Sequence, residues 1–179
     1  MDVRYFLLMR LNFIRQFYQT ASAPYLERKR KITNEEEPFV PEYSEDGEPA
    51  FMIEWNEADD SLQILTYSCI TMLTAALHLY FQSWVKERGL PIEENSHTKK
   101  GWLAFYKEHF MQSKLKINFD EAPVDLKLIE EIILARNNIQ HPSSIVTMRS
   151  HYKKKDLKKL QHPIFVSEIE ARTLRFEDE

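Results

Sequence analysis

Three polar side chains near the end of an apolar helical pattern have the types and spacing needed for acid–base chemistry at a phosphate. Between residues 124 and 142, apolar residues recur at intervals of three and four, which predicts an α-helix with one core-facing side. Polar residues then take over this period at Arg136, Asn137 and His141. A cation, an amide and an imidazole therefore share one corner of the helix. Pro142 predicts that the helix ends at His141.

This arrangement resembles a known motif. The run Arg136-Asn137-Asn138-Ile139-Gln140-His141 is similar to the Arg, polar residue, three to five residues, His motif of the HEPN superfamily. The resemblance implies a compact all-α domain, and many such domains are prokaryotic toxin or defence ribonucleases. It also implies that His141 handles a proton during attack of a ribose 2′-hydroxyl on phosphate, that Arg136 stabilises the developing charge, and that Asn137 orients the histidine or the phosphate. A symmetric homodimer with a composite cleft is implied as well.

Other interpretations stay open. Asn137 and His141 could only bond the last helical carbonyls, with Arg136 paired to Glu131 or to an acid of an earlier loop. A second alternative is a non-catalytic HEPN-like module that dimerises or binds a partner, such as a nucleotidyltransferase-like antitoxin. A third and weaker one is a membrane-associated protein anchored by residues 61–85.

The densest positive patch of the chain follows the motif. A solvated helix face would explain it, but its position also predicts contact with RNA phosphates. Its candidate RNA-binding residues are Arg149, Lys153, Lys154, Lys155, Lys158 and Lys159.

Composition limits the class of protein. The 179 residues fit one domain, and only three glycines argue against Gly-rich phosphate loops and hairpin-rich β folds. Cys69 is the only cysteine, so we expect no disulfide framework, no Cys-based zinc site and a reducing compartment. The scattered histidines indicate no metal site, and no cofactor is indicated. With a net charge of −4, RNA contact must come from local patches. Charges near the N-terminus argue against a signal peptide and favour a cytoplasmic protein.

The periodicity predicts an all-α bundle of about five helices. The first covers residues 3–19, with Asp2 as its cap and Phe6, Phe13 and Phe17 in its amphipathic pattern. Residues 21–31 prolong it after a break before Pro24 and end in a basic run, residues 28–31, which we interpret as a solvated helix end rather than an RNA contact.

The uncharged residues 61–85 predict a central bundle helix rather than a membrane span. Asp59 or Asp60 would cap its start, and Gly89 would end it. Residues 98–112 predict an aromatic core helix. Asp120 and Glu121 would be the N-terminal acids of the motif helix, with Pro123 in its first turn.

Residues 33–60 hold eleven Asp and Glu residues and no Lys or Arg, which predicts a long acidic loop. We favour a solvated excursion, although the loop could lie over the basic segments 28–31 and 149–159, or cover the motif as a phosphate mimic. Residues 161–179 form a tail whose structure the sequence leaves undecided. His78, Glu57 and Glu87 are candidates for a polar residue facing the motif, and for His78 a place in the core is the simpler interpretation.

Overall fold

The computed structural model describes residues 2–42, 49–90, 101–121 and 123–141, together with residues 152, 156, 160 and 163–165. This part of the chain is all-helical, without strands, which confirms the all-α class. The count of about five helices stays a prediction, because the chain beyond His141 is described only at isolated positions. The elements are α1 (Val3–Thr33), α2 (Met52–Glu87), α3 (Trp102–Gln112), the 3-10 helix η1 (Phe119–Glu121) and α4 (Leu126–Gln140).

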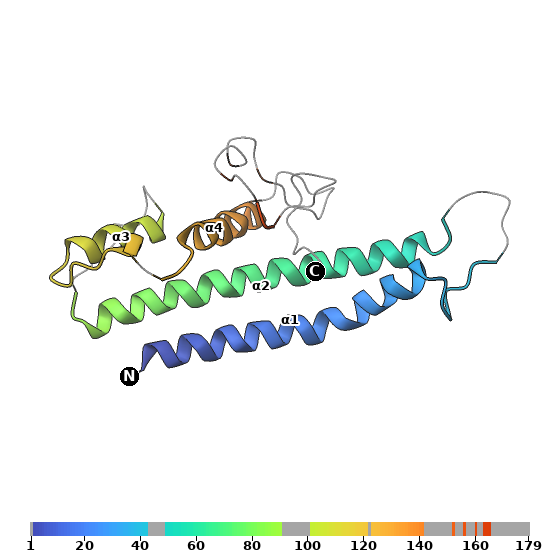
Figure 1. The fold of residues 1–179 in the computed structure, drawn as a ribbon, viewed down its shortest axis with the longest axis horizontal. Helices are drawn as coiled ribbons and strands as arrows, with labels where there is room; N and C mark the ends of the chain where they lie inside the picture. The colour runs from blue at the N-terminus through green and yellow to red at the C-terminus, as the bar shows by residue number, and fades with distance from the viewer. Residues whose placement is uncertain are drawn as a thin grey trace.

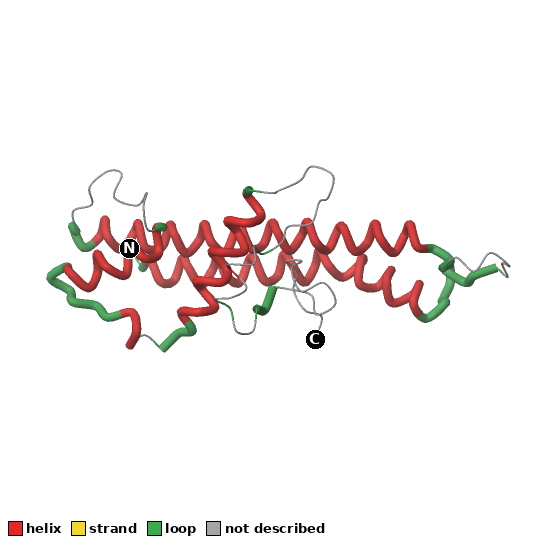
Figure 2. The backbone as a smooth tube through the Cα atoms, turned by 90° about the horizontal axis from the view of Figure 1, so that it is seen from above, coloured by secondary structure: helices red, strands yellow, loops and turns green. Residues whose placement is uncertain are grey.

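The two long helices α1 and α2 form an antiparallel hairpin. Helices α3 and α4 lie on the other side of α2, which is therefore the middle layer (Figure 1). Helix α4 crosses the hairpin obliquely, and its C-terminal end extends beyond one edge of the hairpin (Figure 2). Three apolar clusters hold these layers together, one between α1 and α2, one between α2 and α4, and one between α2 and α3.

Helix α1 begins as the sequence predicts and ends later. The Asp2 carboxylate accepts a hydrogen bond of 3.0 Å from the backbone N–H of Tyr5. The expected break before Pro24 does not occur, because the helix continues through that residue to Thr33. Proline costs a helix one hydrogen bond but fixes a helical φ, so packing of α1 along α2 can offset the loss.

Helix α2 begins at Met52, well before the predicted start at Ser61. Asp59 is not a cap. It lies inside the helix, where its carboxylate accepts a 2.8 Å hydrogen bond from Lys29 of α1, with both side chains largely buried. The Lys29 ammonium also lies 4.3 Å from the centre of the Trp55 ring. Two acidic residues of this stretch, Glu57 and Asp59, thus lie within α2 and pair with cations of α1.

The remaining link between α1 and α2 is correspondingly shorter than predicted, residues 34–51. The basic run at the end of α1 is paired with acidic residues that precede and follow it in the sequence. Arg28 lies 3.8 Å from Glu57, and Arg30 bonds Glu36 and Glu27 at 2.6 and 2.8 Å. These hydrogen bonds from Arg30 lower the pKa of Glu36 and of Glu27. Pairing of these cations favours the structural interpretation of the run over an RNA contact.

Replacing Lys29 with methionine is expected to lower the free energy of unfolding by about 2–3 kcal/mol, because the largely buried Asp59 carboxylate would lose its ion pair with Lys29. The double variant Lys29→Met/Asp59→Leu should recover more than half of that loss. Urea denaturation of the two single variants and the double variant measures the coupling. Simple additivity of the single effects would contradict a coupled pair.

The end of α2 and the aromatic character of α3 agree with the sequence. Helix α2 ends at Glu87, and Gly89 follows with φ of +59°, a conformation that favours glycine. On α3, Tyr106 and Phe110 are buried against Phe81 of α2. By length and composition alone, α2 could cross a membrane, a property that the core helix of a soluble protein shares.

Candidate functional site

Helix α4 positions the motif. Its cap is Asp125, whose carboxylate accepts hydrogen bonds of 2.9 and 3.2 Å from the backbone N–H groups of Lys127 and Leu128. The predicted N-terminal acids were therefore wrong, because Asp120 and Glu121 lie in η1. The apolar side of α4 packs on the middle of α2 through a cluster that includes Leu128, Ile132, Ala135, Ile139, Tyr67 and Ile70. This packing fixes which side of α4 remains open.

The motif side chains lie on the last turn and a half of α4. The helix ends at Gln140, as predicted, and His141 is its exposed C-terminal cap residue. The Arg136 guanidinium donates a 3.0 Å hydrogen bond to the Asn137 side-chain oxygen. Asn138, not Asn137, donates to a helical carbonyl, that of Leu134. Arg136 and Asn137 are thus linked one turn before an imidazole that is open to solvent.

The expected structural partner of Arg136 is engaged elsewhere. Glu131 is buried, and one carboxylate oxygen accepts from the backbone N–H groups of Ile164 and Phe165 at 2.7 and 3.3 Å and from the Tyr152 hydroxyl at 3.3 Å. Across the described segments, no acid forms an ion pair with Arg136. The described neighbours leave the charge of Arg136 available to a phosphate.

Sequence reasoning missed the role of Glu131, which anchors the chain beyond the motif to α4. A signal was present, since Glu131 lies one turn from Leu128 and from Ala135 and so falls within the buried stripe. Tyr152 and Asp156 are also buried. The predicted RNA-binding residues around them, Arg149, Lys153, Lys154, Lys155, Lys158 and Lys159, lie outside the described residues.

A groove of about 520 Å³ between α3 and α4 reaches the motif at Asn137. Its apolar lining includes Trp102 and Ile133. Among the described residues that line the groove, the cation is Lys107, which lies 3.4 Å from Glu130 and 3.7 Å from Asp120. Because this charge is compensated, the groove suits a flat apolar group better than a phosphate.

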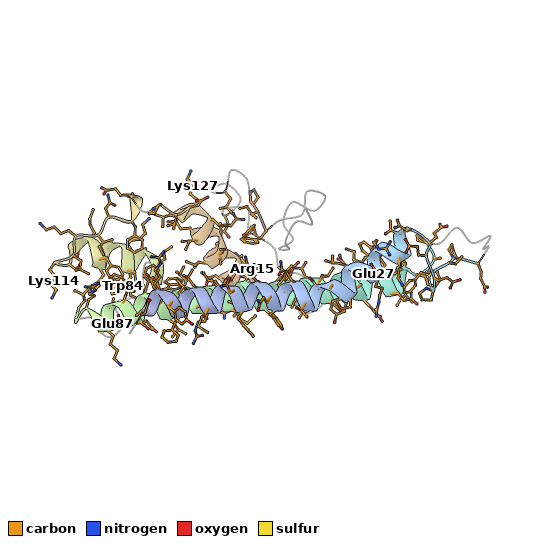
Figure 3. All side chains as sticks on the ribbon, turned by 60° about the horizontal axis from the view of Figure 1, so that its bottom comes forward. Arg15, Glu27, Trp84, Glu87, Lys114 and Lys127 are labelled. Carbon is orange, nitrogen blue, oxygen red and sulfur yellow. The ribbon has the colours of Figure 1, made fainter. Side chains whose placement is uncertain are left out.

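The other polar candidates lie apart from His141. The ring of His78 stacks on Trp102 at 4.9 Å and lies beside Tyr106, as expected of a core histidine. Glu57 pairs with Arg28 at the loop end of the hairpin. Glu87 is the last residue of α2 and lies at the opposite end of this helix, beside Trp84 (Figure 3). Neither carboxylate reaches the middle of α2, where α4 packs.

We compared the chain with protein-family models, curated proteins and solved structures. None matches.

The buried Tyr152 hydroxyl makes the free energy of unfolding depend on pH in the alkaline range. Burial, and secondarily the Glu131 carboxylate, raises the pKa of the Tyr152 hydroxyl far above its usual value. The folded protein therefore keeps a proton that the unfolded chain loses above about pH 10, so stability falls as pH rises through that range. We expect wild type to lose about 1.4 kcal/mol more than Tyr152→Phe between pH 8 and pH 11.

Urea midpoints at these two pH values measure this difference. Tyr5→Phe is the matched control, because Tyr5 is exposed and its replacement should leave the pH dependence of wild type unchanged. Equal pH dependence in wild type and Tyr152→Phe would contradict the prediction.

Proposed function

We propose that the protein is a metal-independent endoribonuclease of HEPN type whose site lies at the C-terminal end of α4. The observation that carries the proposal is the exposed His141 imidazole, one turn beyond the hydrogen-bonded pair Arg136 and Asn137. This set supplies a proton-transfer group, a cation and an amide at a surface that a nucleic acid can reach.

The reaction is an internal transesterification. The ribose 2′-oxygen attacks the adjacent phosphorus, the bond from phosphorus to the 5′-oxygen breaks, and the products end in a 2′,3′-cyclic phosphate and a 5′-hydroxyl. His141 takes the proton of the 2′-hydroxyl, and a second acid or water protonates the leaving 5′-oxygen. Arg136 stabilises the negative charge on the phosphate oxygens, and Asn137 holds the guanidinium in place.

We also propose which surfaces bind the RNA and what role the protein has in the cell. The lysines and the arginine between residues 149 and 159 would bind the RNA backbone, and the groove beside Asn137 would take a base next to the cut phosphate. The working form is a homodimer in the cytoplasm, and the biological role is that of a toxin or defence protein held in check by a partner protein.

The test is incubation of the purified protein with total RNA in EDTA, with the product ends analysed chemically. Cleavage that leaves 2′,3′-cyclic phosphate ends, and that is lost in both Arg136→Ala and His141→Ala, supports the proposal. Equal activity in all three proteins overturns it. If all three are inert at concentrations where the wild type is fully assembled, the partner-binding module replaces it.

A further inference from the structure

We propose that one side of the α1–α2 hairpin is the surface through which two copies of this chain associate. We call this surface the hairpin face. Its large apolar side chains are Phe6, Met9, Phe13 and Phe17 of α1 and Ile64 and Leu79 of α2, with exposed fractions from 38% to 62%. The assignment of the surface stands independently of the nuclease proposal.

The row on α1 lies beside the buried side of that helix, not on it. At about 100° per residue, Phe6, Phe13 and Phe17 fall within about 40° of one another, while buried Ile14 lies roughly a quarter turn away. The rings of Phe13 and Phe17 stack at 6.4 Å. The amphipathic pattern of α1 therefore serves two surfaces, and α2 covers only one of them.

The exposed row on α2 lies on the same side of the hairpin. A shallow groove of about 270 Å³ is lined by Phe6 and Arg10 from α1 and by Leu79 and Ser83 from α2. The α2 row continues from Leu79 towards Ile64 through small exposed side chains, Ala75 and Ser68. Small residues between larger ones allow another pair of helices to approach closely.

The size of the surface fits a second copy. Six large apolar side chains, each about half exposed, present on the order of 500–600 Å² of apolar area. That is the upper end of what an ordinary monomer leaves open. It is also most of the roughly 800 Å² per partner that a stable complex buries.

The charge of the hairpin face decides between a second copy and an anionic membrane. The cations of this surface are Arg10 at the edge of its groove and exposed Lys86, which lies two turns beyond Leu79 on the same side of α2. Arg4 and Arg15 lie roughly half a turn of the helical wheel away from the phenylalanine row. A helix that binds anionic lipid needs cations along the rim of its apolar side. Arg10 and Lys86 lie together at one end of the hairpin face and form no such rim, so the face suits a second copy of the chain better than anionic lipid.

The oblique path of α4 connects this surface with the motif. Arg15, opposite the phenylalanine row, and Lys127, at the start of α4, project towards the same side of the hairpin (Figure 3). Helix α4 then crosses to the other side before it ends at His141 (Figure 2). A partner seated on the hairpin face therefore lies next to the end of α4, so each motif borders the other copy. The use of this border as a composite site rests on the proposed function.

The experiment measures the mass of the full chain by sedimentation equilibrium from 1 to 100 µM. We expect wild type at twice the 21.4 kDa of one chain. Phe13→Glu should weaken association by at least about 30-fold, the loss typical of a central contact residue. Leu8→Glu is the matched control, because Leu8 is about equally exposed on the opposite flank of α1 and its replacement should leave the mass unchanged. Circular dichroism checks that both variants remain folded.

Three outcomes overturn the inference: a wild-type monomer at 100 µM, a dimer that Phe13→Glu leaves intact, or a monomer that sediments with phosphatidylglycerol vesicles. The outcome is separable from the nuclease test. Dissociation by Phe13→Glu in a protein that never cuts RNA supports the interface while the proposed function fails.

Discussion

Under the proposed ribonuclease function, the variant His141→Ala is expected to cut RNA about 100- to 10,000-fold more slowly than wild type, the usual effect of removing a general acid or base. The imidazole is exposed at the end of α4, so its removal opens no cavity and the melting temperature should stay within a degree or two. Single-turnover cleavage of one defined RNA, followed by gel, measures the rate.

The matched control is Gln140→Ala, which changes an exposed residue at the last position of the same helix, a spacer position between Asn137 and His141. It should retain at least half of the wild-type rate. Equal loss in the two variants would show that the end of α4 matters for its shape and not for proton transfer at residue 141.

Replacing Phe110 with alanine is expected to cost about 3–5 kcal/mol of unfolding free energy, the largest effect on stability among the changes considered. Phe110 is 2% exposed and its ring lies about 6 Å from the rings of Phe81, Tyr106 and Phe119, at 6.1, 6.1 and 5.9 Å. The cavity would separate α2, α3 and η1. Urea denaturation with far-UV circular dichroism measures the loss.

Its control is Met111→Ala, the next residue on α3, which is 48% exposed. A surface change of this kind should stay within about 0.5 kcal/mol. If Phe110→Ala were no more damaging than Met111→Ala, α3 would contribute little to the fold, and the groove it forms with α4 would not be a stable feature.

Local signals in the sequence predicted the cores of the four α-helices within the described segments and the end of the motif helix. The Asp2 cap, the turn at Gly89 and the end at His141 each depend on one or two neighbouring residues, so their effects can be read locally. The same holds for α3, where aromatic spacing indicated a buried side. The position of the motif at the end of one helix could be predicted, because the motif is a short run of neighbouring residues.

What the sequence could not predict depends on residues far apart in the chain. The acidic residues at the start of α2 have the composition of a loop. They lie in a helix in which Asp59 pairs with Lys29, a residue thirty positions earlier that no local pattern connects with it. Likewise, the apolar stripe of α4 indicates that Glu131 is buried, but the groups that donate hydrogen bonds to it belong to residues 152, 164 and 165, which no local pattern identifies. The phenylalanines of α1 are apolar residues that the structure leaves exposed. A period of 3.6 identifies the apolar side of a helix but does not show which neighbouring element covers it.

The hairpin has a further consequence for the order in which the protein folds. At its loop end, Lys29 meets Asp59 across thirty residues, whereas Phe6 and Leu79 line one groove across seventy-three. Closing the shorter segment costs about 0.8 kcal/mol less in chain entropy. We therefore expect the hairpin to form from its loop end, so that the N-terminal third of α1 docks last and frays first. A second copy bound at Phe6 and Phe13 would therefore stabilise the N-terminal third of α1, the part of the hairpin that docks last.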